Sequence, residues 1–498
     1  MIKPVLVLTI CCLILVFAFS PHVFPFTTDS LIYISTAENI REGNGLAFDN
    51  VFVEPPEPDV LALKLHPPGY SFLIALLHSL GFSAYTAALI IPRFFFLLLP
   101  MGFFLVFSHM MPRKLSMVTA GLCALMFPYL RCALMAWADI PFLFLSLISF
   151  VLIFKTVSTG NKQQLACAFL SGVLTGGALL TRNAGYALVL SIGSGFILMF
   201  ALKIMVFKKL LKVVCYYLAG FFSLVMPYMI RNYLVFGEVN PYRLPPANVT
   251  LSENLADYSQ ALSQMIFANP FYHGVLLVLM AGMLAWFMAA AGQWIKTDKH
   301  KIFCAAVLII YFLSGSLLVI LSKTMYFMPE KINERYLIQY AWIIVAGLSY
   351  GVYFLLSKLR TVRPIDTRGV TFLIFTAFLL VQIFPAADLY FQQKKTLYIA
   401  KKVETHAPLL FEIPKDHVIV SNIMDMTAFF SRRDVRLLNG YMPYGLLRIL
   451  GAKRKFAVFI VKARHENYKS YLYPSAWLKP EGYRRVYSNR DVALWLPE

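Results

Sequence analysis

Charged residues are scarce in this chain. Only 14% of its 498 residues are Asp, Glu, Lys or Arg, whereas 59% are hydrophobic. Soluble proteins contain about 25% charged residues, so the composition excludes an ordinary soluble protein. Acidic residues are the rarer of the two signs, with 25 against 45 basic ones. The resulting net charge of +20 must be accommodated by loops and by any extramembrane domain.

Cysteine is also sparse and is never arranged in a metal or redox pattern. All seven cysteines lie in or beside apolar runs, and no two of them form a CxxC pair. The spacing therefore gives no support to a zinc or dithiol site. We expect no structural disulfides, because none of the cysteines lies in the long polar segments.

Long apolar runs dominate what is present. Many of them approach the roughly 20 residues that cross a hydrocarbon core, so we predict a polytopic α-helical membrane protein of about eleven transmembrane helices. The predicted spans are 4–20, 84–108, 116–130, 139–154, 164–180, 184–202, 213–230, 273–295, 302–322, 336–357 and 369–390.

Lys and Arg residues predict the orientation of these spans. With the N-terminus in the cytoplasm, the short inside loops are basic, as in 203–212 and 358–368, while the first outside loop, 21–66, has seven acids and two bases. This agrees with the positive-inside rule in the inner (plasma) membrane. The first run lacks a clear small-residue cleavage site, so we favour an uncleaved helix over a signal peptide.

The chain divides into two predicted domains. Residues 1–390 form a transmembrane domain with large outer loops at 21–82 and 231–272, within which 67–82 resembles a helix lying in the interface. Residues 391–498 carry 19 basic and 9 acidic residues and contain short β-branched runs at 417–420, 456–461 and 491–496. We expect this tail to be a small extracytoplasmic α/β domain with a basic surface.

Two aspartates lie at the predicted outer boundary of the membrane. Asp29 follows the first span in an outer loop, and Asp139 begins the fourth span with Pro141 two residues later. Ionisable groups at this level need a partner or a function. The alternatives are an ordinary loop position for Asp29 and helix N-capping for Asp139.

Four arginines lie at outer helix ends, where the positive-inside rule disfavours them. A single one could extend its head group to the interface, but four at one level, together with carboxylates, predict a site for an anion such as a phosphate. They are Arg131, Arg182, Arg231 and Arg335. A sugar leaving a lipid phosphate needs that charge neutralised while a carboxylate takes the acceptor proton. No second nucleophile is evident, so direct displacement with inversion is plausible.

Several short motifs follow one another along the chain: Asp29 with Tyr33 and Gly43-Asn44-Gly45, His66-Pro67-Pro68-Gly69, Asp139-Ile140-Pro141, Leu179-Leu180-Thr181-Arg182, Arg231-Asn232-Tyr233 with Phe236-Gly237, and Glu334-Arg335-Tyr336. In this order they resemble the GT-C membrane glycosyltransferases, in particular bacterial proteins similar to the protein O-mannosyltransferases and the lipid A aminoarabinose transferase. One departure lies just before the paired prolines. The aminoarabinose transferase has an acid and a lysine at those two positions, whereas this chain has Leu65 and His66.

The resemblance implies a polyprenyl-phosphate-linked sugar donor and an acceptor hydroxyl on a glycan, lipid or protein. It implies Asp29 as the base and Asp139 as a second catalytic acid, with Arg131, Arg182 and Arg335 facing the donor phosphate. Substrate-binding roles are also expected for Tyr33, His66, Arg231 and Glu334, although a structural role for His66 stays open. A divalent metal, Mg or Mn, stays open as well, with Asp29 and Asp139 as its ligands.

A transporter or flippase of a lipid-linked saccharide is the alternative function. Transporters place their binding groups near the bilayer midplane, often on broken helices within repeated halves. Here the charged groups cluster at one face, and no internal repeat is evident. The sequence therefore favours the enzyme, with membrane lipids as surroundings and no nucleic-acid partner.

Overall fold

A computed structural model describes most of the chain. The described residues are 2–20, 23–49, 60–64, 66–241, 247, 249–267, 298–326, 332–360, 382, 394, 396–414, 417–421, 427, 435–437, 456–461, 483–488 and 492–497. They fall into two compact units. One comprises Met1–Ala18, Lys64–Tyr70 and Ile90–Ala387, and the other comprises Phe19–Leu63, Ser71–Leu89 and Asp388–Glu498.

Apolar helices make up most of the first unit, and the chain is a multi-pass membrane protein. Within the described residues six helices are long and apolar enough to cross a membrane, or seven if one bent pair counts as a span. The six are α4 (Ala84–Phe107), α7 (Asp139–Ser158), α8 (Asn161–Thr181), α10 (Phe207–Phe236), α13 (Lys299–Met325) and α14 (Glu334–Arg360). Each corresponds to a span predicted from hydropathy.

Shorter apolar helices account for three further predictions. They are α1 (Ile2–Phe19), α3 (Gly69–Ser79) and α9 (Gly185–Ala201). Helix α3 is the segment expected to lie in the interface, and its depth stays a prediction. The predicted span 273–295 lies outside the described residues, as does 369–390 apart from Gln382.

The predicted span 116–130 is a broken helix. Helix α5 (Arg113–Ala124) and helix α6 (Phe127–Leu134) are bent by 51° at Leu125 and Met126. Pro128 occupies the first turn of α6, where its missing N–H costs no helical hydrogen bond. In the middle of a continuous helix the same proline would break the helix. The amide of Phe127 donates to the Gln382 side chain at 3.0 Å, so the break is hydrogen-bonded within the bundle.

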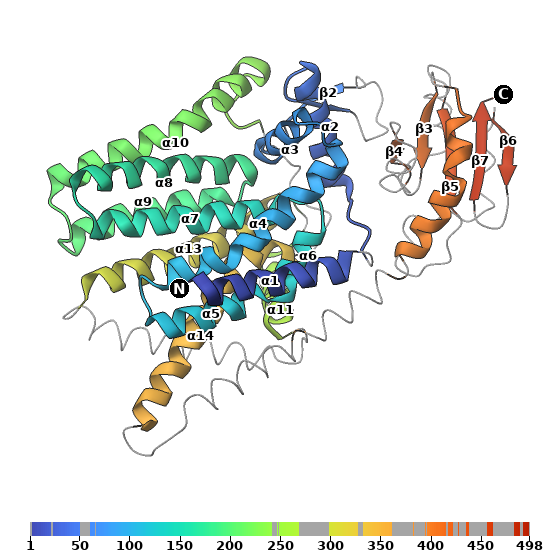
Figure 1. Cartoon of the computed structure of the whole chain (residues 1–498). Coiled ribbons are helices and arrows are strands. Elements are labelled where there is room, and N and C mark those ends of the chain that lie inside the picture. The colour runs from blue at the N-terminus through green and yellow to red at the C-terminus, as the bar shows by residue number, and fades with distance from the viewer. Residues whose placement is uncertain are drawn as a thin grey trace. The chain divides into compact units, whose positions relative to one another are not determined.

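Small and hydroxyl side chains hold the central helices together. Helix α8 lies beside both α7 and α10 (Figure 1). A Cβ on Gly172 would collide with the carbonyl of Tyr217, and one on Gly220 with that of Phe169, so α8 and α10 approach at glycine. Between α7 and α8, Ser149 hydrogen-bonds Thr175 at 2.7 Å.

Aromatic packing fixes α14 in the bundle. Trp342 is fully buried, with its ring centroid 6.0 Å from Phe103 and 5.8 Å from Phe107 on α4. Its Nε1–H donates to the carbonyl of Gln339 at 2.8 Å, which satisfies the indole. Helix α11 (Leu251–Phe267) packs against α13 and α14.

The second unit begins with helix α2 (Thr28–Glu42). Thr27 precedes it, and its amide donates to Ser30 Oγ at 3.0 Å, as in a capping box. Strand β1 (Ala47–Asp49) then pairs with the antiparallel strand β2 (Val60–Ala62). The expectation that Asp29 lies in a loop is wrong, because Asp29 belongs to the first turn of α2.

The tail holds a five-stranded mixed sheet in the order β4-β3-β5-β7-β6. Its strands are β3 (Val418–Ser421), β4 (Val435–Leu437), β5 (Phe456–Val461), β6 (Tyr483–Ser488) and β7 (Val492–Pro497), and residues 396–411 are helical. The three strand segments predicted from β-branched runs are confirmed. The boundary at residue 391 and the side of the membrane on which the sheet lies stay predictions.

Candidate functional site

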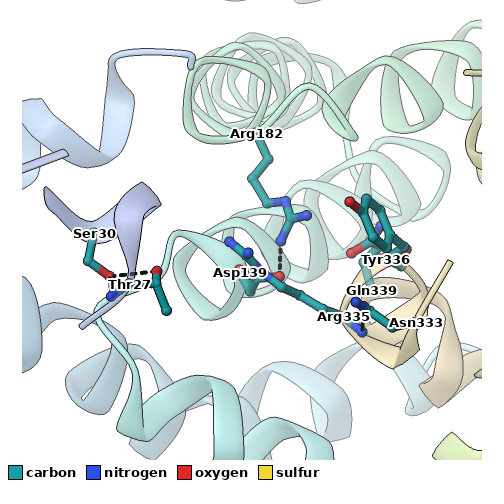
Figure 2. A network of polar contacts seen from close by, with 8 residues as sticks. All are labelled: Thr27, Ser30, Asp139, Arg182, Asn333, Arg335, Tyr336 and Gln339. Atoms are coloured by element: carbon teal, nitrogen blue, oxygen red, sulfur yellow. Dashed lines mark hydrogen bonds and ion pairs between the residues drawn. The ribbon is translucent and has the colours of Figure 1, made fainter. Parts of the chain in front are cut away.

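Asp139 is the centre of the charged cluster in the first unit. Its side chain has no exposed surface and forms salt bridges with Arg182 and Arg335 (Figure 2). The Arg182 Nη1 atom faces Asp139 Oδ1, and the Nε of Arg335 lies 3.4 Å from Asp139 Oδ2. One carboxylate thus faces two guanidinium groups, one at each oxygen, and its Oδ2 accepts a hydrogen bond from the Nε of Arg335.

Three helix ends bring these charges together. Asp139 is the first residue of α7, and Arg182 caps the C-terminal end of α8, the next helix along the chain. The loop between α7 and α8 is short, so the start of α7 and the end of α8 lie at the same end of the pair. Arg335 is the second residue of α14, where its amide donates to Asn333 Oδ1 at 3.0 Å.

The N-capping alternative for Asp139 does not describe its side chain. The N-cap residue of α7 is Ala138, and Asp139 uses its carboxylate for the two arginines instead. Pro141 lies in the first turn, where its missing amide hydrogen costs no helical bond. The acid-and-proline motif therefore begins a helix and presents a carboxylate to neighbouring helices.

Trp137 contacts the guanidinium group of Arg335. The guanidinium carbon of Arg335 lies 4.1 Å from the centroid of the Trp137 ring, within the range of a cation–π contact. Trp137 is 7% exposed, so the guanidinium is held between an aromatic face and a carboxylate. The sequence analysis did not single out Trp137, although an aromatic residue two positions before a boundary carboxylate was an available signal.

Two glycines fit closely around the residues that precede Arg182. A Cβ on Gly69 would lie 2.6 Å from the carbonyl oxygen of Leu180, and one on Gly185 would lie 2.5 Å from the Cα of Leu179. The His-Pro-Pro-Gly motif thus packs against the last turn of α8. His66 itself is half-buried at the start of that motif.

The remaining arginines occupy other surroundings. Arg131 is half-buried in the last turn of α6. Arg231 lies within α10 rather than at its end; it donates to Asn232 Oδ1 at 3.0 Å and lies 5.0 Å from the Phe236 ring centroid. Glu334 begins α14, and its side chain lies outside the described residues. The structure therefore joins Arg182 and Arg335 through Asp139, and the contacts described for Arg231 are those with Asn232 and Phe236.

Asp29 and Tyr33 belong to the second unit. They lie four residues apart on α2, hence on one face of that helix. Asp29 is half-buried and Tyr33 is 4% exposed. A carboxylate in the first turn of a helix is stabilised by the helix dipole. The ionised Asp29 side chain is therefore favoured at this half-buried position.

A divalent cation fits poorly at Asp139. Among the described residues, no three His, Cys, Asp or Glu side chains gather closely enough to hold a metal. Both oxygens of Asp139 already face guanidinium groups, which would repel a cation bound there.

Lys323 is a charged residue that sequence analysis missed. It is 4% exposed near the end of α13, and its Nζ lies 4.5 Å from the centroid of the Tyr336 ring on α14. In the predicted orientation, a lysine at this end of the span departs from the positive-inside rule, as the four arginines do. That signal was present in the sequence but was applied only to arginine.

Comparison with solved structures identifies the fold. No family model matches the chain, and no curated protein matches it by sequence. The structure is similar to ArnT from Cupriavidus metallidurans bound to undecaprenyl phosphate, with a TM-score of 0.60 and 12% identity over 99% of this chain and 97% of ArnT. The apo state of ArnT gives a TM-score of 0.57 at 12% identity with the same coverage of both chains.

A second similar structure is the archaeal oligosaccharyltransferase AglB from Archaeoglobus fulgidus in complex with an inhibitory peptide and a dolichol-phosphate. Its TM-score is 0.56 at 13% identity, over 92% of this chain and 69% of AglB. ArnT, a lipid A aminoarabinose transferase, and AglB are both GT-C proteins. The chain therefore has the GT-C fold, and the resemblance predicted from the motifs is confirmed at the level of the fold.

Proposed function

We propose that the chain is an inverting glycosyltransferase that moves a sugar from a polyprenyl-phosphate-linked donor to an acceptor hydroxyl at the outer face of the membrane. The observation that carries the proposal is the buried Asp139 carboxylate held by Arg182 and Arg335 at three helix ends. The fold adds support, because it is shared over 99% of the chain with a protein that binds undecaprenyl phosphate.

The charge balance of the cluster suits a lipid phosphate. One carboxylate and two guanidinium groups leave a net charge of +1 on these three residues. Guanidinium groups match phosphate oxygens with parallel hydrogen bonds. A phosphate that lost a sugar would gain negative charge, and the arginines would stabilise that charge in the transition state more than in the ground state.

The arrangement favours Asp29 over Asp139 as the base. Each oxygen of Asp139 faces an arginine guanidinium group, and in this proposal Asp139 holds Arg182 and Arg335 in place. Asp29 lies half-buried in the first turn of α2. In the proposed step the acceptor oxygen attacks the anomeric carbon, its proton passes to the Asp29 carboxylate, and the sugar–phosphate bond breaks. The polyprenyl phosphate departs with the electron pair, and the configuration inverts.

The remaining predicted residues have secondary roles in this proposal. Tyr33, His66, Arg131, Arg231 and Glu334 stay substrate-binding hypotheses, and Arg131 would face the donor phosphate as well. The acceptor is a glycan, a lipid or a protein, and the location is the plasma membrane with the N-terminus inside and the tail domain outside. A divalent metal ligated by Asp29 and Asp139 is disfavoured by the arginines at Asp139.

Mass spectrometry of cell-surface glycans, glycolipids and glycoproteins tests the proposal. Cells lacking the protein are complemented with the wild type or with Asp29→Asn. We expect one glycan to lose a sugar, to regain it with the wild type, and to stay incomplete with the variant. Accumulation of intact lipid-linked saccharide on the inner side, or full complementation by Asp29→Asn, would instead favour a flippase.

A further inference from the structure

Arg93 is a charged residue that the proposed reaction does not use. It is the tenth of the 24 residues of α4, a helix with the length and hydropathy of a membrane span. Its side chain is half-buried, and its buried Nε atom has no hydrogen-bond partner. A guanidinium group at such a position is costly unless it has a partner or a function.

The charge of Arg93 is not matched within the part of the chain that the structure describes. There, Arg93 forms no ion pair, hydrogen bond or ring contact. Arg182 and Arg335 differ from it, because both face the carboxylate of Asp139. An anion that lies outside these residues is therefore the partner that Arg93 requires.

The helix face that carries Arg93 is the exposed face of α4. Exposed or half-buried side chains recur on this face at helical spacing, at Thr86, Ile90, Phe94, Leu97 and Met101. The opposite face is buried in the bundle through Phe96, Leu99 and Phe103. An exposed and mainly apolar stripe along a membrane span faces lipid. Arg93 thus lies where a lipid can reach it.

Arg93 also lies deep in α4 when measured from either end of the helix. At about 1.5 Å per residue, its Cα is about 13 Å along the axis from Ala84 and about 21 Å from Phe107. A helix of this length extends about 3 Å beyond each face of a hydrocarbon core of roughly 30 Å, so the Cα lies about 10 Å below the nearer face. An extended arginine side chain reaches about 7 Å, given bond lengths near 1.5 Å.

This depth decides what the guanidinium group can contact. Extension of the side chain towards the interface leaves its head about 3 Å below the nearer face of the core. The head groups of an undisturbed bilayer lie outside that face. The charge is therefore matched only if an anionic group of a lipid moves down to it.

We propose that Arg93 binds the phosphate of a lipid at the lipid-facing side of α4. A guanidinium group matches phosphate oxygens with parallel charged hydrogen bonds. Bilayer phospholipids and polyprenyl phosphates both carry this group, and a phospholipid is the expected ligand because the stripe borders the bilayer along its length. This site goes beyond the proposed sugar transfer, which assigns no role to α4.

Lipid binding by the purified full chain in detergent tests the inference, with affinities from native mass spectrometry. One pair of probes is phosphatidylglycerol and diacylglycerol with the same acyl chains, and the other is undecaprenyl phosphate and undecaprenol. We expect Arg93→Met to weaken phosphatidylglycerol binding by at least about tenfold, the loss of one charged hydrogen bond, and to leave diacylglycerol binding unchanged. Arg93→Lys should retain most of the phosphate affinity.

Arg484→Met is the matched control, because it removes an exposed arginine from strand β6 and should leave all four affinities unchanged. A loss for undecaprenyl phosphate alone would support the phosphate contact and identify the polyprenyl lipid as its source. If Arg93→Met weakens each phosphate lipid and its phosphate-free counterpart equally, or changes none of the four, the inference is overturned. Should Arg93→Met fail to fold, Arg93→Gln compared with Arg93→Lys makes the same distinction. The assay involves no sugar transfer, so failure of the proposed reaction would leave this inference standing.

Discussion

Substituting Asp139 with asparagine should destabilise the fold far more than a change of one oxygen to nitrogen suggests. The side chain is fully buried, while those of Arg182 and Arg335 are 16% and 19% exposed. At the 3.4 Å separation of the Arg335 Nε and the carboxylate, the attraction is about 5 kcal/mol for an effective dielectric constant near 20. Removing the charge also takes this carboxylate from two guanidinium groups at once.

Breaking a buried ion pair from one side typically costs about 3–5 kcal/mol, and we expect Asp139→Asn to fall in that range. With an unfolding entropy of about 2.1 cal/mol/K per residue, the whole 498-residue chain loses about 1 °C of Tm for each kcal/mol. The predicted drop is therefore at least about 3 °C. Thermal unfolding in detergent, followed by tryptophan fluorescence, measures it.

Asp298→Asn is the matched control. Asp298 also pairs with a cation, Lys301, at 2.8 Å, but their side chains are 35% and 44% exposed. Such pairs contribute about 1 kcal/mol or less, and Asn caps a helix as well as Asp does. A Tm loss for Asp139→Asn no larger than that for Asp298→Asn would refute the electrostatic account. So would additive losses for Asp139→Asn and Arg182→Gln, because residues in direct contact should be coupled.

Three further predictions concern Asp29 and two glycines at close helix contacts. Asp29→Asn should abolish sugar transfer, because asparagine cannot take the acceptor proton, and should leave a folded protein; a glycan assay and the yield of folded, monodisperse protein check the two halves. Gly220→Leu should prevent α8 and α10 from packing, because its Cβ would collide with the Phe169 carbonyl. The control Gly193→Leu has open space around its Cβ and should fold; the yield of folded, monodisperse protein measures both. Gly69→Ala places a Cβ 2.6 Å from the Leu180 carbonyl and should displace the end of α8 with Arg182, raising the KM for the donor, while Gly351→Ala should not.

Hydropathy was sufficient to predict most of the helices. Each span is a long apolar run, and that signal depends on the bilayer rather than on tertiary packing. The break at Leu125 was missed because the run is apolar throughout, although Pro128 was a visible reason to end one helix and begin another. The helical start at Thr27 was missed too, and its Thr-x-x-Ser spacing resembles a capping box.

Charge at the outer boundary predicted part of the site. Asp139, Arg182 and Arg335 were singled out because each breaks the expectation for its position, and the structure brings them together. Trp137 and Lys323 were not singled out, although an aromatic residue near Asp139 and a lysine at the end of a predicted span were visible in the sequence. The sequence does not specify which residues they contact, Arg335 for Trp137 and Tyr336 for Lys323. Arg231 was expected at a helix end, but α10 continues to Phe236, so its position could not be judged from hydropathy alone.

The most direct test of the central claim follows the donor lipid itself. Membranes containing the wild type or Asp29→Asn are supplied with polyprenyl-phosphate-linked sugars, and mass spectrometry quantifies the free polyprenyl phosphate and the glycosylated acceptor. A glycosyltransferase releases one polyprenyl phosphate for each sugar transferred, and Asp29→Asn should stop both. Movement of intact donor between leaflets, with no polyprenyl phosphate released, would contradict the account.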